Sequence, residues 1–281
     1  MDKKIRVSTI NIAIPHPKSI SQLDYRLLQA EKYLNEAGRK RSDIVCLPEA
    51  FNAVTGKTPA ENSVKMPDSD IGRYIGEKAK LYKMNIIAPV YEKYKGKVYN
   101  SSVVFNRKGK IIGRYLKTHL PGEKCEKGVE LPVIKTDFGK IGIMTCHDMG
   151  FMEIPRAYML KGAEIVFWPT MWGHEEIPEY TLLYMKAAAL LNSVYVVSSD
   201  FAWTAKDKRC KPCGSYIVSP NGGVLATKGC KGGLVTADIT LYRDFRKYKD
   251  TSDCYDPNPG IRRQALLKER RPNLYKIIAK K

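Results

Sequence analysis

Hydrophobic and polar residues alternate with two different periods along this chain. Residues 5–14 carry apolar side chains at nearly every second position, a pattern typical of a β-strand. Residues 21–39 place apolar side chains near a period of 3.6, which predicts a helix that starts at Ser21 and ends close to Gly38. Residues 42–48 are apolar without strict alternation, as in a strand that is covered on both faces.

The remainder of the chain continues to alternate between strand-like and helix-like segments. We expect helices at residues 70–82, 153–161 and 180–192, and strands at 86–91, 98–105, 111–115, 133–136, 141–145, 163–169, 194–199, 216–219 and 224–226. Interleaved strands and helices predict an α/β fold, and the hairpin signals favour two mixed sheets packed together with helices outside. The expected architecture is thus a four-layer α-β-β-α sandwich that forms a single domain over residues 1–281. We expect residues 256–281 to be a tail that packs on the body or on a partner subunit.

Charge adds one feature that the pattern does not explain. The chain has 48 Lys and Arg against 29 Asp and Glu, which gives a net charge of +19, and residues 240–281 contribute +7 of it. Hydrophobic residues at 43% and charged residues at 27% exclude a disordered or collagen-like protein. The apolar runs are far shorter than the roughly 20 residues that span a bilayer, so no membrane partner is expected. An odd number of cysteines, seven, favours a reducing compartment and predicts a cytoplasmic location.

Three chemically reactive side chains directly follow buried apolar runs. They are Glu49, Lys117 and Cys146. Because ligands bind at the ends of strands in α/β sheets, residues far apart in sequence can meet there. A cysteine can attack an electrophilic carbon, a carboxylate can carry its proton, and a lysine can stabilise the resulting oxyanion. Taken singly, each residue also has an ordinary interpretation, namely a core cysteine, a solvated glutamate and a surface lysine.

The segments around these residues resemble the three signature segments of the nitrilase superfamily of carbon-nitrogen hydrolases. They read LPEAF around Glu49, YLKTHLPGE around Lys117 and IGIMTCHDMGFMEIPR around Cys146, in the order of the family. The segments YNSSVVFNRKGKIIGRY, KGAEIVFWPTMWG, GSYIVSPNGGVLA and ERRPNLY extend the resemblance from residue 5 to about residue 275.

The resemblance implies a role for each of the three residues. Cys146 would be the nucleophile, Glu49 the general base and then the acid, and Lys117 the group that stabilises the oxyanion. It also implies a second glutamate after the lysine, for which Glu123 is the better match and Glu126 the alternative. The backbone N–H of residue 147 would complete the oxyanion hole.

The implied reaction is hydrolysis of a carbon–nitrogen bond through a cysteine acyl-enzyme, with release of ammonia or an amine. Members act on amides, N-carbamoyl compounds or nitriles, and we expect a small amide or N-carbamoyl substrate here. The resemblance implies neither a metal nor an organic cofactor, and it implies a homodimer or a higher homo-oligomer. Many members have an aromatic residue where this chain has His147, which leaves the substrate open.

Four residues near the same strand ends are candidates for binding the substrate, namely His119, His147, Trp172 and His174. A structural role for His119, and simple packing for Trp172 and His174, are the alternatives. We expect Asp148 to brace the turn beside the nucleophile.

Two other features point to other functions. The spacing of Cys210 and Cys213 is that of a metal or redox pair, but the later cysteines are too loosely spaced for a zinc site, and an ordinary loop is the favoured interpretation. The positive charge raises the possibility of nucleic-acid binding, yet the chain contains no recognisable nucleic-acid-binding motif. A catalytically inactive assembly protein is a third reading, which the intact set of three reactive residues argues against. We therefore expect no metal and no nucleic-acid partner.

The charge leads to a prediction about the substrate. A field from a net charge of +19 attracts anionic substrates such as carboxylate-bearing carbamoyl compounds. Added salt should then lower kcat/KM for an anionic substrate and leave kcat/KM for a neutral analogue unchanged. Equal salt dependence for the two substrates would contradict a role for this field.

Overall fold

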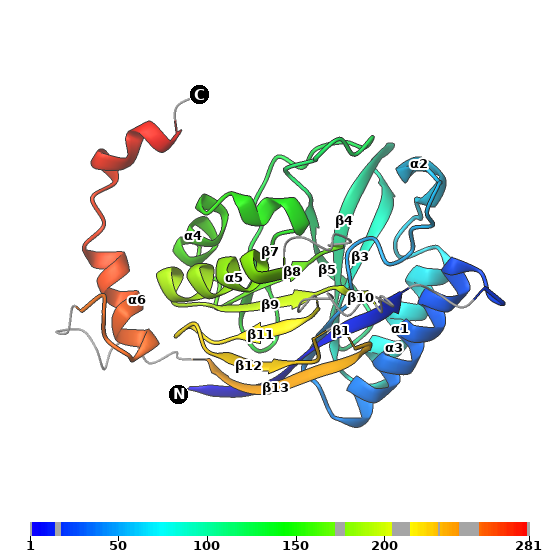
Figure 1. Cartoon of the computed structure of the whole chain (residues 1–281), viewed down its shortest axis with the longest axis horizontal. Helices are drawn as coiled ribbons and strands as arrows, with labels where there is room; N and C mark the ends of the chain where they lie inside the picture. The colour runs from blue at the N-terminus through cyan, green and yellow to red at the C-terminus, as the bar shows by residue number, and fades with distance from the viewer. Residues whose placement is uncertain are drawn as a thin grey trace.

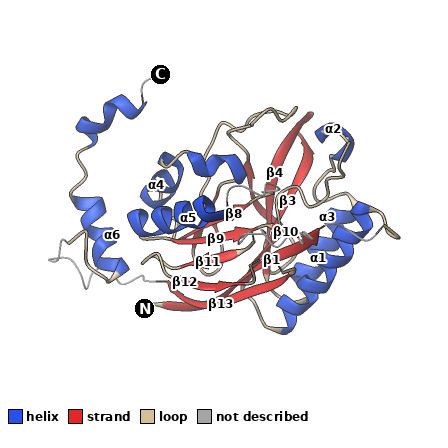
Figure 2. Cartoon of the chain, in the orientation of Figure 1, coloured by secondary structure: helices blue, strands red, loops and turns tan. Residues whose placement is uncertain are grey.

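Two mixed β-sheets lie face to face, with helices on both outer faces (Figures 1 and 2). The computed structural model describes residues 2–14, 18–171, 178–203, 214–229, 231–241 and 253–279. The first sheet has the strand order β10-β1-β2-β3-β4-β5, with β13 also paired to β1, and the second has the order β12-β11-β9-β8-β7-β6. The expected four-layer architecture is confirmed.

The strands of the first sheet are β1 (Lys3–Ile14), β2 (Ile44–Cys46), β3 (Asn85–Tyr94), β4 (Lys97–Phe105), β5 (Ile111–Leu116), β10 (Phe201–Trp203) and β13 (Gly233–Leu241). Those of the second are β6 (Ile134–Lys135), β7 (Lys140–Ile143), β8 (Ile165–Pro169), β9 (Tyr195–Ser199), β11 (Tyr216–Val218) and β12 (Val224–Thr227). The helices are α1 (Gln22–Arg39), α2 (Pro59–Asn62), α3 (Asp70–Leu81), α4 (Glu153–Leu160), α5 (Pro178–Asn192) and α6 (Pro259–Lys268).

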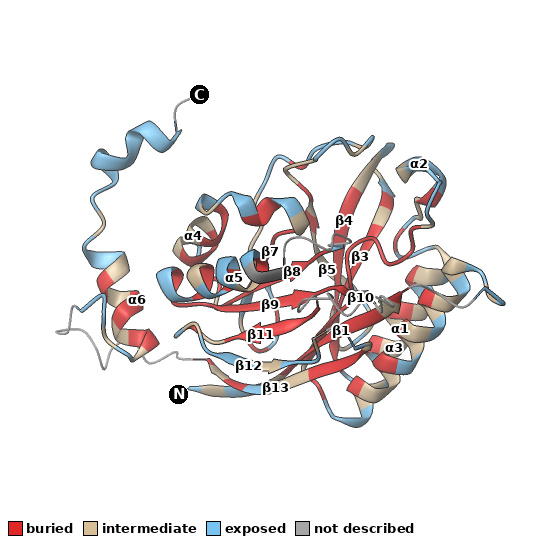
Figure 3. Ribbon diagram, viewed as in Figure 1, coloured by how far each residue is buried: buried red, intermediate tan, exposed pale blue. Residues whose placement is uncertain are grey.

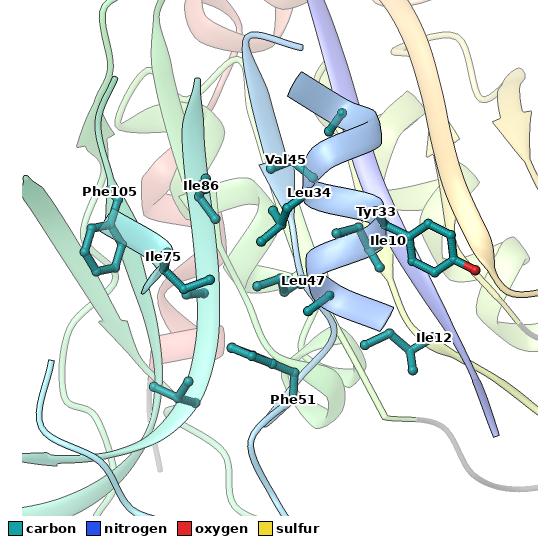
Figure 4. Close-up of a cluster of buried hydrophobic side chains, with 14 of the residues drawn as sticks. Ile10, Ile12, Tyr33, Leu34, Val45, Leu47, Phe51, Ile75, Ile86 and Phe105 are labelled. Atoms are coloured by element: carbon teal, nitrogen blue, oxygen red, sulfur yellow. The ribbon is translucent and has the colours of Figure 1, made fainter. Parts of the chain in front are cut away.

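Buried side chains form one apolar layer between the sheets and one under each pair of helices. The layer between the sheets includes Ile44 and Val104 from the first sheet and Ile143 and Phe167 from the second, all fully buried. Figure 4 shows the layer in which α1 and α3 cover the first sheet, and a third cluster lies under α4 and α5. Figure 3 shows that the buried residues are concentrated in the strands of the two sheets.

Strand pairing explains why the run at residues 42–48 is apolar without alternation. β2 pairs in parallel with β1 on one side and with β3 on the other, in the middle of the first sheet. The helices cover one face of this strand and the second sheet covers the other. Val45 accordingly packs under the helices and Ile44 between the sheets, and both are fully buried. The prediction of a strand covered on both faces is confirmed.

Both ends of α1 lie where the sequence pattern predicts them. Ser21 caps the start of the helix and accepts a hydrogen bond from the backbone N–H of Asp24, and the helix ends at Arg39, one residue after Gly38. A Cβ at Gly38 would lie 2.1 Å from Cγ of Tyr82. Besides lying next to the end of the helix, the glycine is therefore needed for close packing against that ring.

Hydrogen bonds tie the two sheets together beside β2. The chain leaves the second sheet at the end of β9 and enters the first sheet at β10, passing through Asp200. The Ser199 hydroxyl lies 2.9 Å from the carbonyl of Ile10 and 3.0 Å from that of Cys46, and the Thr9 hydroxyl donates to the carbonyl of Ser198 at 2.7 Å. These contacts fix the second sheet against the end of β2.

The C-terminal segment divides into two parts. Helix α6 contacts the body and buries Arg262, Arg263 and Ala265. The 3-10 helix Pro272–Ala279 buries none of its residues and projects from the body in Figure 1. Within the ranges given above, no helix has the length and apolar character needed to cross a lipid bilayer.

Candidate active site

Both sheets contribute to one site at the ends of their strands. Glu49 lies three residues beyond β2, and Lys117 follows β5 directly, so the first sheet supplies both. Cys146 lies beyond β7 in the second sheet, where it begins the 3-10 helix Cys146–Gly150. The face-to-face packing of the sheets therefore brings a nucleophilic thiol toward a carboxylate and an ammonium group.

Lys117 is the centre of this cluster. Its side chain is 1% exposed, and its Nζ donates to Oε1 of Glu49 at 2.9 Å and forms a second ion pair with Oε1 of Glu123. Glu49 is 3% exposed. Burial therefore excludes the interpretations of Lys117 as a surface lysine and of Glu49 as a solvated glutamate. A buried ammonium group needs charged partners of this kind.

Of the two glutamates proposed after the lysine, only Glu123 contacts it. Glu126 forms an ion pair with Lys97 at 3.1 Å, and both of these side chains are at least half exposed. Its backbone N–H donates to the carbonyl of Val98, so this segment runs along the start of β4. Glu123, the better match in the sequence, thus contacts the lysine, while Glu126 pairs with a lysine elsewhere.

Asn100 in β4 is a member of the cluster that sequence reasoning missed. Its Nδ2 donates to Oε1 of Glu49 at 2.8 Å and to Oε2 of Glu123 at 2.9 Å. Its backbone carbonyl accepts a hydrogen bond of 2.9 Å from the N–H of Lys117. An asparagine inside a strand carries no sequence signal for such a contact, because the contact exists only once β4 and β5 have paired.

The backbone at Cys146 is strained. Its φ is +45°, in the left-handed region that residues other than glycine rarely adopt and that recurs at functional sites. Its carbonyl accepts a hydrogen bond of 2.9 Å from Nε1 of Trp168.

Asp148 holds this turn in place, as expected. One of its oxygens accepts from the backbone N–H of Thr145 at 2.8 Å and from the Tyr115 hydroxyl at 2.6 Å. The other accepts from the Thr118 hydroxyl at 3.0 Å and from the backbone N–H of His119 at 3.1 Å. The single buried carboxylate therefore docks the segment that carries Lys117 onto the turn that carries Cys146.

Electrostatics keep the thiol neutral and the lysine charged. Burial, followed by the nearby charge of Glu49, raises the pKa of the Cys146 thiol, and the opposing effects of Lys117 and Thr170 do not compensate. Burial works against a charge on Lys117, but Glu49, Cys146 and Glu123 outweigh it and raise the pKa of the ammonium group. At neutral pH the site therefore combines a protonated thiol with a charged lysine.

The two described histidine candidates lie together at the rim of the site. The ring of His119 stacks on Phe151 with 3.6 Å between centroids, and its Nδ1 lies 2.9 Å from Oδ1 of Asp148. His147 meets the edge of the same Phe151 ring at 5.9 Å. His119 thus takes part in bracing the turn, while its side chain remains partly exposed.

The remaining candidates lie outside the described residues, namely Trp172, His174, Cys210 and Cys213. In the part of the chain that the structure describes, no group of three or more His, Cys, Asp or Glu side chains is arranged to hold a metal ion. The chemistry available from the cluster itself is nucleophilic. A thiol beside a carboxylate and a fixed ammonium can carry out acyl transfer, in which the carboxylate moves the proton and the ammonium meets the developing oxyanion.

The chain is similar to several known proteins in sequence and in fold. The family model of the carbon-nitrogen hydrolases matches residues 6–246. An omega-amidase from Xenopus laevis is 30% identical over 293 residues, covering 99% of each chain. A member of branch 10 of the nitrilase superfamily from Saccharomyces cerevisiae shares the fold with a TM-score of 0.73 and 24% identity, over 89% of this chain and 96% of that one. An amidase from Nesterenkonia shares it with a TM-score of 0.74 and 18% identity, over 97% and 96% of the two chains. Because the family model and the amidase relative both extend over most of its length, this chain belongs to the carbon-nitrogen hydrolase family.

Proposed function

We propose that this protein hydrolyses the carbon–nitrogen bond of a small amide or N-carbamoyl compound through a thioester on Cys146. The observation that carries the proposal is the buried Lys117 ammonium, which is paired with Glu49 and Glu123 and electrostatically coupled to Cys146. A structural ion pair would not require a strained, partly exposed cysteine beside it.

The first half of the reaction uses the thiol, the carboxylate and the ammonium together. Because the thiol is protonated at rest, Glu49 takes its proton as Sγ bonds to the carbonyl carbon. The carbonyl oxygen becomes an oxyanion, which Lys117 and the backbone N–H of His147 stabilise. Glu49 then returns the proton to the leaving nitrogen, the carbon–nitrogen bond breaks, and ammonia or an amine departs.

In the second half of the reaction, a water molecule replaces the thiol as the nucleophile. Glu49 takes a proton from a water molecule, whose oxygen attacks the thioester carbon, and Lys117 again stabilises the oxyanion. The carbon–sulfur bond breaks, the acid product leaves, and the thiol regains its proton. Glu123 holds Lys117 in position throughout, and no metal or cofactor takes part in this scheme.

The relatives favour an amide substrate over the nitrile alternative. The Xenopus laevis relative is an omega-amidase. The Nesterenkonia amidase, in a glutamate-to-glutamine variant, shows covalent addition of the acetamide moiety of fluoroacetamide at its active site cysteine. That adduct identifies the cysteine of a protein of the same fold as a nucleophile, which is the role that we propose for Cys146.

Replacement of the nucleophile should abolish activity. Ammonia release from a panel of amide and N-carbamoyl compounds is expected to fall to background in Cys146→Ala, because the proposed thioester forms on the sulfur that this substitution removes. Cys254→Ala, which removes an exposed thiol of the described part of the chain, is the matched control and should leave the rate unchanged. Undiminished ammonia release in Cys146→Ala would refute the mechanism.

The raised pKa of the Cys146 thiol predicts how alkylation depends on pH. A raised thiol pKa means that the neutral form persists to higher pH than in an ordinary cysteine. The rate of alkylation by iodoacetamide should therefore keep rising between about pH 7 and pH 9, without a plateau. Mass spectrometry of the Cys146 peptide measures this rate, with the exposed Cys254 as an internal reference. A plateau near neutral pH would indicate a preformed thiolate and would contradict the need for Glu49 as a base.

We also propose that the protein forms a homo-oligomer through the side that carries α5 and the C-terminal 3-10 helix. Large apolar residues are uncovered on both elements, including Leu183 at 61% exposure and Ile277 at 72%. A soluble monomer rarely leaves so much apolar surface to water.

Free cysteines in the described part of the chain, including the exposed Cys254, are compatible with the cytoplasmic location that we infer from the cysteine number.

Charge placed on this surface should separate the subunits. We expect Leu183→Asp combined with Ile277→Asp to shift the protein to a monomer in sedimentation equilibrium. Leu28→Asp, at a half-exposed position on α1, is the control and should leave the oligomer intact. A wild-type protein that is already monomeric would contradict the proposal.

A further inference from the structure

The amide group of Asn100 is oriented entirely by two carboxylates. Its side chain is 1% exposed, and the two hydrogens of Nδ2 go one each to Glu49 and Glu123. Its Oδ1 is buried and has no hydrogen-bond partner among the described residues. Because carboxylates only accept hydrogen bonds, the amide has to present its nitrogen to them and leave its oxygen without a partner. Buried polar groups are rarely left in this state, and an exception of this kind suggests a role in function.

The hydrogen bonds around the two glutamates are not symmetric. Glu123 has one donor on each oxygen, since Lys117 contacts Oε1 and Asn100 donates to Oε2. Glu49 has both donors on the same oxygen, Oε1, at 2.9 Å from Lys117 and 2.8 Å from Asn100. No residue in the described part of the chain donates to Oε2 of Glu49. Of the four carboxylate oxygens in the cluster, this one alone lacks a described donor.

We propose that Asn100 is a positioning residue that gives the two glutamates different roles. It directs Oε2 of Glu49 to the proton of Cys146, and it holds both oxygens of Glu123 so that this carboxylate only anchors Lys117. A hydrogen bond stabilises the ionised form of a carboxylate, so the oxygen without donors is the better proton acceptor. The inference rests on the proposed function, in which Glu49 takes the thiol proton.

Lys117 could not make this distinction alone, because it contacts one oxygen of each carboxylate, whereas Asn100 donates to that same oxygen in Glu49 and to the other oxygen in Glu123. Asn100 adds a donor to each without adding charge. A second cation at this position would instead stabilise the ionised carboxylates further and weaken Glu49 as a base. The strand also holds Asn100 firmly, because β4 pairs with β5 next to it and the Asn100 carbonyl accepts from the Lys117 backbone.

The test compares Asn100→Leu and Asn100→Asp with a control on the same strand. Both variants keep the approximate size of the side chain and remove its two donors. Ser102 lies two residues further along β4, is equally buried, and has a hydroxyl without a partner, so Ser102→Ala is the matched control. All variants are checked for folding by circular dichroism before ammonia release from an amide substrate is measured.

We expect kcat to fall on the order of 10²-fold in both Asn100 variants, since small displacements of a catalytic group cost about that much. KM should change little, because Asn100 acts on the glutamates and not on the substrate. Alkylation of Cys146 by iodoacetamide should slow together with kcat. Ser102→Ala should match the wild type in all three measurements.

A kcat within about twofold of the wild type in a folded Asn100 variant, or a loss confined to KM, would overturn the proposal. If Asn100→Leu does not fold, the same two outcomes are measured in Asn100→Asp and overturn the proposal in the same way. The proposed function fails separately, through ammonia release that persists in Cys146→Ala. Activity that requires Cys146 but tolerates Asn100→Leu would reject the positioning role alone.

Discussion

The arrangement of the active site depends on the burial of one ammonium group, that of Lys117. Removing the Lys117 charge from water costs several kcal/mol, and only close anionic partners offset that cost. Glu49 and Glu123 supply them from two different segments, one after β2 and one after β5. The pairing of β2, β3, β4 and β5 in a single sheet is therefore a condition for burying the lysine at all.

A second constraint is that the nucleophile belongs to the opposite sheet and has to be held against the lysine and the glutamates. Asp148 links the two halves by accepting hydrogen bonds from Tyr115 and Thr118 on one side and from Thr145 on the other. Ser199 adds a further connection at the end of β2. Burial, together with the nearby charge of Glu49, raises the pKa of the thiol and leaves it protonated, which is why a base is needed next to it.

Local patterns predicted much of this structure. The layers, the N-cap at Ser21 and the doubly covered strand β2 follow from periodicity, because burial determines which side chains are apolar. The three strand ends that carry Glu49, Lys117 and Cys146 could be found in the same way. β13 was not predicted, and its residues alternate between buried and more exposed positions only near the end of the strand, at residues 238–241.

Features that depend on contacts between distant segments could not be read from the sequence. Gly38 has the signature of a helix end, and only the Tyr82 ring, which arrives from after α3, shows why a glycine is there. The donor role of Asn100, the ion pair between Glu123 and Lys117 and the positive φ of Cys146 all require the packed sheets. Local pattern therefore located the reactive residues, while tertiary contacts determine how they are arranged.

The apolar layer between the sheets sets the distance between the reacting groups that the two sheets carry. The base and the cation stand on one sheet and the sulfur on the other, so the volumes of Ile44, Val104 and Phe167 help set the separation of the reacting atoms. Protein interiors are packed too tightly to absorb a change in volume without a shift of the backbone. Side chains that never meet the substrate are thus under selection for alignment as well as for stability, and the freedom of this core to drift in evolution is narrower than its plain aliphatic composition suggests.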